Sequence, residues 1–389
     1  MNALRKYVDK IKPNFHEGGK YHALRSLFDG FETFLFVPND TAKTGTHIHD
    51  AMDSKRLMSV VVIALVPALL FGMYNVGYQH YIHAVGMPGS FIEMFIYGFL
   101  AVLPKIIVSY VVGLAIEFTV AQWKGEEIHE GFLVSGILIP MIVPIGCPLW
   151  MLAVATAFSV IFAKEVFGGT GMNIFNPALV TRAFLFFAYP AKMSGDSVWV
   201  ADYSIFGLGE TVDGLTVATP LGQAATGVPV DASICEMITG LIPGSIGETS
   251  VIAIAIGAVI LLVTGVASWK TMISVFVGGI LMGLIFNAAG PDTAVAQMPW
   301  YEHLCAGGFC FGAVFMATDP VTSCRTEKGK YFYGLLIGAM AIIIRVLNPG
   351  YPEGMMLAIL LMNTFAPLID HIVVQGNISR RAKRALSNK

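Results

Sequence analysis

The chain has 389 residues, of which 55% are hydrophobic and only 13% are charged, and its mean hydropathy is +0.69. One soluble core cannot bury so much apolar surface, so the composition indicates a polytopic membrane protein. The net charge of −2 argues against nucleic acid as a partner, and five scattered cysteines without a CxxC pair argue against a disulfide framework or an iron–sulfur motif.

Residues 1–56 are polar and mixed in charge, and we expect them to form a cytoplasmic cap with one or two short helices. The segment starts with basic residues and has no apolar core, so it does not resemble a cleavable signal peptide. The first membrane span is expected over Leu57–Gln79, which contains no charge. At about 1.5 Å per residue this stretch is long enough for a hydrocarbon core about 30 Å thick.

Nine further spans are expected, some of them short or broken. The uncharged stretch Phe132–Ala163 contains Pro140, Pro144 and Pro148, which predict a short helix, a break and a second helix. Together with these two, the remaining spans are expected in Ile92–Gln122, Asn176–Tyr189, Val251–Trp269, Thr271–Gly290, Leu304–Thr318, Tyr331–Val346 and Gly354–Ile369.

The distribution of lysine and arginine predicts the topology. Nine of the 24 basic residues precede residue 57 and five follow Gln375, so both termini are expected in the cytoplasm, with an even number of spans between them. Residues 190–249 contain only one basic residue, Lys192, and seven acidic ones, so this loop is expected to face outward. The predicted organisation is a cap (1–56), a first transmembrane repeat (57–189), an outward loop (190–249), a second repeat (250–373) and a basic cytoplasmic tail (374–389).

The two halves share a weak internal similarity. A glycine-phenylalanine pair opens a short helix in each half, at Gly131-Phe132 and at Gly308-Phe309, and an Asn-Pro pair follows at Asn176 and at Asn348. These features predict an all-α fold of about ten transmembrane helices in two inverted five-span repeats, an arrangement typical of proteins that move a solute near the midplane of the membrane. Chance similarity is the alternative.

The outward loop contains the run Thr216-Val217-Ala218-Thr219. From the residues alone, a threonine in such a loop is more often an ordinary turn residue than a modified one. The run resembles the flavinylation motif Ser/Thr-Gly-Ala-Ser/Thr of the B and C subunits of sodium-translocating NADH:quinone oxidoreductases and of the related Rnf complexes, with Val217 in place of the usual glycine. In that family a flavin transferase attaches FMN to the last threonine. The resemblance therefore implies covalent FMN on Thr219, with Thr216 as the leading hydroxyl.

The resemblance to the family of the B subunit covers essentially the whole chain. It includes Lys164–Gly171, Asn176–Leu179, Ile242–Glu248, Ala317–Pro320 and Asn348–Gly354. It implies one component of a redox-driven sodium pump in the bacterial inner membrane, which carries FMN and non-covalent riboflavin and reduces a quinone. The implied partners are the A, C, D, E and F subunits, quinone, Na⁺, membrane lipid and the flavin transferase.

The glycine-rich run Gly168–Gly171 is, from the residues alone, most simply a turn between helices. The resemblance implies more, because it places Asn173 and Asn176 at the riboflavin. It also places Gly113 near the quinone, and glycine is the residue that permits close approach of a flat ring to the backbone.

Ionisable side chains within apolar spans are costly unless they are paired or hydrated. The six candidates are Lys105, Glu117, Arg182, Asp319, Arg345 and Asp370. Ion pairs that hold helices together are one explanation, and a functional role is the other. Carboxylates are hard oxygen ligands of the kind that small cations prefer, and the resemblance implies that Glu117, Asp319 and Asp370 take up sodium. The nine histidines contain no HxxxH pair, so no metal centre is expected.

Two alternatives remain open at this stage. The D subunit of an Rnf complex shares the membrane core and the flavin threonine but typically lacks a long N-terminal extension. A flavin-free channel or secondary transporter also fits paired five-span halves, which are similar to the urea-transporter type of fold. No dinucleotide-binding fingerprint and no iron–sulfur spacing is found, so partner subunits must oxidise NADH.

Overall fold

The computed structural model describes residues 2–15, 25, 28, 32, 45, 54–124, 131–200, 217–348 and 350–387. Within these ranges every regular element is a helix, so the predicted all-α class is confirmed. Six of the described helical segments are long and apolar enough to cross a membrane. They are Arg56–Val85, Phe91–Lys124, Leu149–Phe167, Trp269–Ala289, Glu327–Leu347 and Met355–Leu386.

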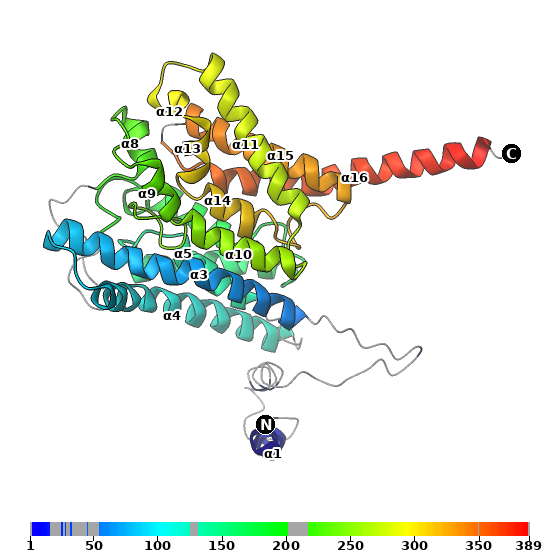
Figure 1. The fold of residues 1–389 in the computed structure, drawn as a ribbon. Coiled ribbons are helices and arrows are strands. Elements are labelled where there is room, and N and C mark those ends of the chain that lie inside the picture. Colours follow the sequence, from blue (N-terminus) through cyan, green and yellow to red (C-terminus); the bar gives the residue numbers. More distant parts are fainter. Residues whose placement is uncertain are drawn as a thin grey trace.

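Two of these long segments lie side by side as an antiparallel pair along the lower edge of the bundle in Figure 1. They are α3 (Ser54–His80), which continues into the π-helical turn η3 (Tyr81–Val85), and α4 (Phe91–Lys124). Gly98 of α4 faces the backbone of Met73, and an ideal Cβ at Gly98 would lie 1.7 Å from the Met73 carbonyl oxygen. Only glycine allows the two helices to approach this closely.

The rest of the first half contains the predicted broken segment. Helix α5 (Phe132–Met141) ends at a non-helical stretch, and α6 (Leu149–Ser159) begins after Pro148, so the predicted break is confirmed. The π-helical turn η4 (Val160–Lys164) and the 3₁₀ turn η5 (Glu165–Phe167) extend α6, and α7 (Pro177–Ala188) follows the glycine-rich run.

Three short elements lie between the halves, within the described part of residues 190–249. They are η6 (Pro190–Lys192), α8 (Pro220–Thr226) and α9 (Ile234–Thr239). Glu236 and Ser233 form a capping box at the start of α9. The backbone N–H and the hydroxyl of Ser233 donate to the Glu236 carboxylate and hold its pKa below the ordinary value.

The second half packs around α11 and α15, which lie against each other along their length. Their contact uses glycines, since an ideal Cβ at Gly338 would lie 2.0 Å from the Val275 carbonyl oxygen. The helices of this half are α10 (Val251–Val263), α11 (Trp269–Ala289), α12 (Ala294–Gln297), α13 (Trp300–Cys305), α14 (Phe309–Phe311) with the π-helical turn η7 (Gly312–Met316), α15 (Glu327–Leu347) and α16 (Met355–Ser387).

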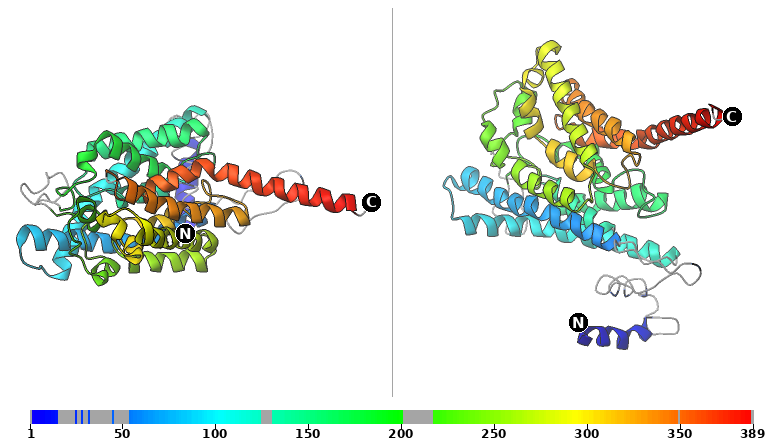
Figure 2. Two further views of the ribbon diagram at one scale, coloured as in Figure 1. Left: turned by 90° about the horizontal axis from the view of Figure 1, so that it is seen from above. Right: turned by 45° about the vertical axis from the view of Figure 1, so that its right-hand side comes forward.

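Helix α16 runs past the end of the bundle and projects far from it, as both views in Figure 2 show. It continues without a break through residue 374, so the described part of the basic tail is a helical extension of the last long helix. Near the other terminus, α1 (Asn2–Ile11) and η1 (Lys12–Asn14) lie apart from the bundle in Figure 1. Phe15 stacks on Phe28 there, with ring centroids 4.5 Å apart.

The distribution of side chains is that of a protein in lipid. Large apolar side chains such as Ile63, Val111 and Leu281 are exposed on the outer faces of the long helices. Three basic side chains, by contrast, are fully enclosed or nearly so: Lys105, Arg182 and Arg345 are 0–1% exposed. An apolar exterior around a charged interior is the pattern expected of a membrane bundle with internal polar sites.

Candidate functional site

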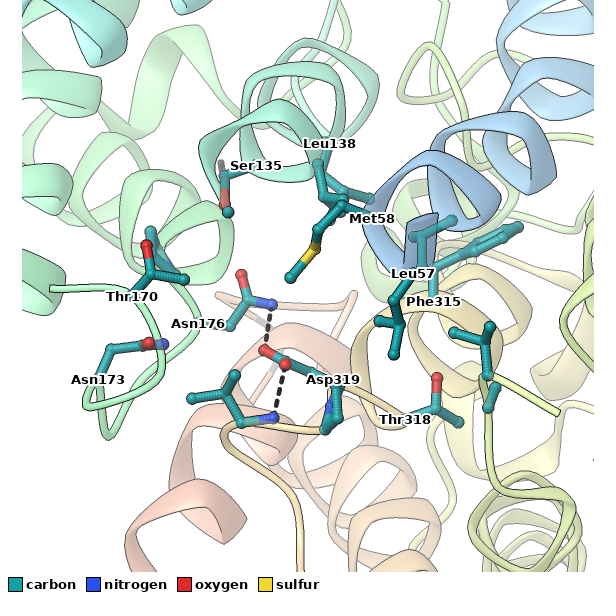
Figure 3. Close-up of a pocket in the computed structure, with 18 of the residues that line it drawn as sticks. Leu57, Met58, Ser135, Leu138, Thr170, Asn173, Asn176, Phe315, Thr318 and Asp319 are labelled. Atoms are coloured by element: carbon teal, nitrogen blue, oxygen red, sulfur yellow. Dashed lines mark hydrogen bonds between the residues drawn. The ribbon is translucent and has the colours of Figure 1, made fainter. Parts of the chain in front are cut away.

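A cavity lies at the end of the bundle where α3 begins, and segments from both halves line it (Figure 3). The volume of the cavity is about 90 Å³, which is below the range of about 300–1,000 Å³ typical of small-molecule pockets, so a ligand of flavin size requires its walls to move apart. The polar lining comes from Ser135, Lys164, Thr170, Asn173, Asn176, Thr318 and Asp319, and Leu57, Leu138 and Phe315 are among the apolar lining residues.

The glycine-rich run positions the two asparagines in this cavity. Gly168, Gly169 and Gly171 adopt positive φ angles of 113°, 90° and 90°, a backbone conformation that favours glycine. The resulting turn returns the chain to Asn176, whose side-chain oxygen accepts a hydrogen bond from the Ala178 amide at 2.9 Å and caps α7. Asn176 as the N-cap and Pro177 in the first turn therefore start α7 at the cavity wall.

The second asparagine retains hydrogen-bonding capacity. The Asn173 side-chain amide donates to the carbonyl oxygen of Phe175 at 2.9 Å. Its side-chain oxygen accepts no hydrogen bond from the part of the chain that the structure describes, and the residue is 9% exposed. An amide that can both donate and accept suits a heteroaromatic ligand with N–H and C=O groups at its edge.

Asp319 closes the cavity from the second half of the chain. Its carboxylate accepts from the Asn176 amide at 3.0 Å, from the Val321 backbone at 3.0 Å and from the Thr322 hydroxyl at 3.1 Å. Figure 3 shows the bond between Asn176 and Asp319. The structure thus brings Asn173 and Asn176, which were predicted together, into one cavity with Asp319, which was predicted as part of the ion path.

A buried ion pair lies at the edge of the cavity. Lys164, at the end of η4, donates to the Oε1 atom of Glu117 in α4, and the two side chains are 5% and 4% exposed. One helical turn earlier in α4, an ideal Cβ at Gly113 would lie 1.9 Å from the ring of Phe132. The face of Gly113 that was predicted to approach a quinone is therefore covered by the chain's own phenylalanine.

The remaining predicted carboxylate, Asp370, has a different position. It lies on α16 and accepts from the backbone amides of Arg325 and Thr326, at 2.8 and 3.0 Å, and from the Thr326 hydroxyl at 2.5 Å. These bonds satisfy donors at the start of α15. Asp370 is not among the residues that line the cavity.

Thr219 lies at the opposite end of the bundle. Its hydroxyl oxygen accepts from the Gly222 amide at 3.1 Å and caps α8, and the residue is half-buried. It shares a small pocket with Glu248, Glu353 and Gly307. The other threonine of the motif, Thr216, lies outside the described residues.

The separation of the two sites follows from α3. Leu57, near the start of α3, lines the cavity, whereas Asn75 donates to the carbonyl oxygen of Ile242, which lines the Thr219 pocket. The 18 residues between Leu57 and Asn75 correspond to about 27 Å of helix. The two candidate cofactor sites therefore lie at opposite ends of α3.

A buried charge network that the sequence reasoning left unassigned lies beside Thr219. Arg182 of α7 donates to Glu353, to Ser245 at 3.2 Å and to Glu248 at 3.4 Å. The network joins the first half of the chain to the second, and the single positive charge of Arg182 partly compensates the two carboxylates near Thr219. Of the residues in this network, only Arg182 was a candidate from the sequence, as an ionisable residue in an apolar span. No local pattern in the sequence indicates that Glu353 is its partner.

Arg345 fixes the turn before α14 in a different way. It donates to backbone carbonyl oxygens at Glu353 (2.8 Å), Ala306 (3.0 Å) and His303. The guanidinium provides several donors in fixed directions, which suits a turn with several free carbonyl groups. Arg345 was a candidate from its position in an apolar span, and the structure assigns it this structural role.

Comparison with known proteins identifies the family of the chain. The model of the NQR2, RnfD, RnfE family matches residues 41–379. The chain belongs to that family. The resemblance inferred from the sequence is therefore confirmed at the family level.

Several full-length relatives of this family carry a more specific name, the B subunit of Na(+)-translocating NADH-quinone reductase. The chain is 45% identical to the protein of that name from Chromohalobacter salexigens, over 98% of this chain and 96% of that relative. It is 44% identical to the proteins of the same name from Azotobacter vinelandii and Klebsiella pneumoniae, each over 98% of this chain and 99% of the relative.

Proposed function

We propose that the chain is the membrane-embedded B subunit of a sodium-translocating NADH:quinone reductase, and that it carries non-covalent riboflavin and covalent FMN and passes electrons to quinone with coupled sodium export. The observation that carries the proposal is the cavity in which Asn173 and Asn176 meet Asp319 beside the buried Lys164–Glu117 pair. The polar edge and apolar walls of this cavity suit a flavin. The neighbouring charge pair supplies a carboxylate for a cation.

The chemistry of the side chains that line the cavity suits a riboflavin, and the cavity must widen from its volume of about 90 Å³ to admit one. Its apolar part, including Leu138 and Phe315, suits a flat ring system, and the free oxygen of Asn173 suits a ring N–H. A flavin bound there would accept and donate electrons. In this proposal Asn173 and Asn176 orient it, and Asp319 holds Asn176 in place by accepting its amide hydrogen bond.

Thr219 is the proposed attachment point for FMN. Its hydroxyl oxygen acts as an acceptor towards Gly222, so a phosphodiester at the same oxygen retains an acceptor function. The neighbouring carboxylates of Glu248 and Glu353 are held by Arg182, which reduces their repulsion of a phosphate. Thr216 is proposed to assist as the leading hydroxyl of the motif.

The sodium path is proposed to use Glu117, Asp319 and Asp370. Each of these carboxylates has protein partners in the structure, so binding of a cation by both oxygens of one of them requires that carboxylate to exchange a partner for the ion. Export against the membrane potential costs about 2.3 kcal/mol per charge per 100 mV, and electron transfer must supply this energy. A quinone at Gly113 requires Phe132 to move from the face that it covers.

The wider fold proposal is ten spans in two inverted five-span repeats, with both termini in the cytoplasm of a bacterial cell and the 190–249 loop outside. It is supported by the short helices α5 and α14, each of which begins at a phenylalanine after a glycine. The A, C, D, E and F subunits, a flavin transferase and membrane lipid complete the proposed setting.

The two alternative functions are less well supported. The D subunit of an Rnf complex belongs to the same family. However, the relatives named as the B subunit match 98% of this chain, and the family model begins only at residue 41. The B-type assignment therefore accounts for the N-terminal extension. A flavin-free transporter accounts for neither the name of these relatives nor the motif at Thr219.

The first test concerns the covalent flavin. The Thr219→Ala chain, purified within the complex and denatured in SDS, is expected to lose all in-gel flavin fluorescence of its own band because it lacks the acceptor hydroxyl. Thr226→Ala on the same short helix is the matched control, since Thr226 is exposed and bonds only the backbone of α8. Fluorescence that survives in Thr219→Ala contradicts the assignment.

A further inference from the structure

Lys164 belongs to two environments at once. It lines the cavity together with Asn173 and Asn176, and its ammonium group forms the buried ion pair with Glu117. The described residues place no second carboxylate within ion-pair distance of Lys164, because Glu165 pairs with Lys124 at 3.6 Å instead. Lys164 is therefore a charged group shared between the cavity and α4.

Glu117 has an unused oxygen in this arrangement. Its Oε1 accepts from Lys164, whereas its Oε2 is buried and has no hydrogen-bond partner among the described residues. A buried carboxylate oxygen without a partner is energetically unfavourable and can accept a further donor or a cation. The ring of Phe132 flanks the pair, with Lys164 Nζ 6.0 Å from its centroid.

We propose that Lys164 couples negative charge in the cavity to cation binding at Glu117, as a positioning residue that moves between the two. The inference rests on the proposed function, which places the riboflavin in the cavity and Glu117 on the sodium path. It assigns a role to Lys164 that neither of those proposals contains.

Charge balance provides the physical argument. The Lys164–Glu117 pair is neutral, so a Na⁺ added at Oε2 leaves one uncompensated positive charge in a buried region, which is strongly disfavoured. An electron that reaches the cavity from the upstream carriers of the complex adds one negative charge and restores neutrality. Negative charge in the cavity therefore favours Na⁺ binding at Glu117, and bound Na⁺ favours reduction in the cavity.

In response to this charge balance, the ammonium group of Lys164 moves between Glu117 and the cavity. With negative charge in the cavity, the ammonium group is attracted toward it and releases Oε1, so that both oxygens of Glu117 can bind Na⁺. When the electron passes on to quinone, the ammonium group returns to Glu117 and displaces the cation. No bond to Lys164 forms or breaks in this cycle, and the side chain keeps its three protons.

The test compares three variants in the assembled complex: Lys164→Gln, Lys164→Arg and the control Lys124→Gln. Lys124 forms the neighbouring pair between the same two segments but is 35% exposed and does not line the cavity. Three quantities are measured: the extractable non-covalent flavin, the midpoint potential of that flavin at low and at high Na⁺, and the KM for Na⁺ in quinone reduction.

Lys164→Gln is expected to retain the flavin, to reduce the Na⁺-dependent shift of its midpoint potential at least twofold, and to lower the KM for Na⁺ at least fivefold, since no ammonium group competes for Glu117. Lys164→Arg restores most of the shift, and Lys124→Gln matches the unmodified complex. A Lys164→Gln complex that holds flavin and shows an unchanged shift and KM overturns the proposal.

A second variant covers the case in which Lys164→Gln loses the flavin. Glu117→Gln leaves the cavity lining intact and releases the ammonium group, so the midpoint potential at low Na⁺ is expected to rise and to become independent of Na⁺. An unchanged potential at low Na⁺ overturns the proposal. Absence of extractable flavin from the unmodified complex contradicts the proposed function instead.

Discussion

Asn176 shows how much a single side chain contributes to the candidate site. Its oxygen caps α7, its amide donates to Asp319, and the residue also lines the cavity. The start of a helix at Asn176-Pro177 could be predicted from local sequence, because capping depends on neighbouring residues. The bond to Asp319 could not, because 143 positions separate the two residues and only the fold brings them together.

The neighbouring asparagine provides the clearest test of the cavity. Asn173→Ala is expected to reduce the affinity for non-covalent flavin about five- to tenfold, since one lost neutral hydrogen bond costs about 1–1.5 kcal/mol. The measurement is the flavin extracted per complex after gel filtration. Met172→Ala is the control, because Met172 is 70% exposed and lies outside the cavity lining. Equal flavin content in the two variants contradicts the role of Asn173.

Lys164, to which we assign the coupling role, was not among the candidates from the sequence. It stands at the end of an apolar run, four residues before Gly168, whereas Lys105 and Arg182 were candidates because they lie within apolar spans. Its pairing with Glu117 depends on the packing of η4 against α4. A pattern of residues along the chain contains no information on that packing.

At the scale of elements, the interruption between two helices could be predicted from the sequence, but the extension of α16 could not. Pro140, Pro144 and Pro148 identify the interruption between α5 and α6, because proline removes a helical hydrogen bond. The extension of α16 into the basic tail was not predicted, since its polar composition was interpreted as the end of the membrane span. Arginine, lysine and alanine are good helix formers, so the helix continues after the apolar segment ends.

The close contact between α3 and α4 can be tested with a matched pair of glycines. Gly98→Ala is expected to destabilise the protein by about 1–3 kcal/mol, because its methyl group would overlap the Met73 carbonyl oxygen and separate the helices. Gly376→Ala on the exposed part of α16 has open space around it and should stabilise the helix by up to about 1 kcal/mol. Thermal inactivation of the purified complex measures both, and equal shifts would refute the contact.

For the molecule as a whole, the proposed topology places α9 and the end of α16 on opposite sides of the membrane. Cys235 on α9 is exposed, so a membrane-impermeant maleimide added to spheroplasts is expected to label it. A cysteine introduced at Asn377, on the exposed part of α16, should react only after the cells are lysed. Labelling of both positions in intact spheroplasts would show that the two segments share one side.

The lining of the cavity has a consequence for biogenesis. Its wall includes residues from Leu57 to Val321, and the bond that closes it joins Asn176 to Asp319. A ribosome must therefore synthesise more than four fifths of the 389 residues before the cavity is complete. The proposed riboflavin could therefore bind only after the second half of the chain has been inserted. We expect a truncated chain to bind no flavin in this cavity, and its empty cavity could mark it for degradation.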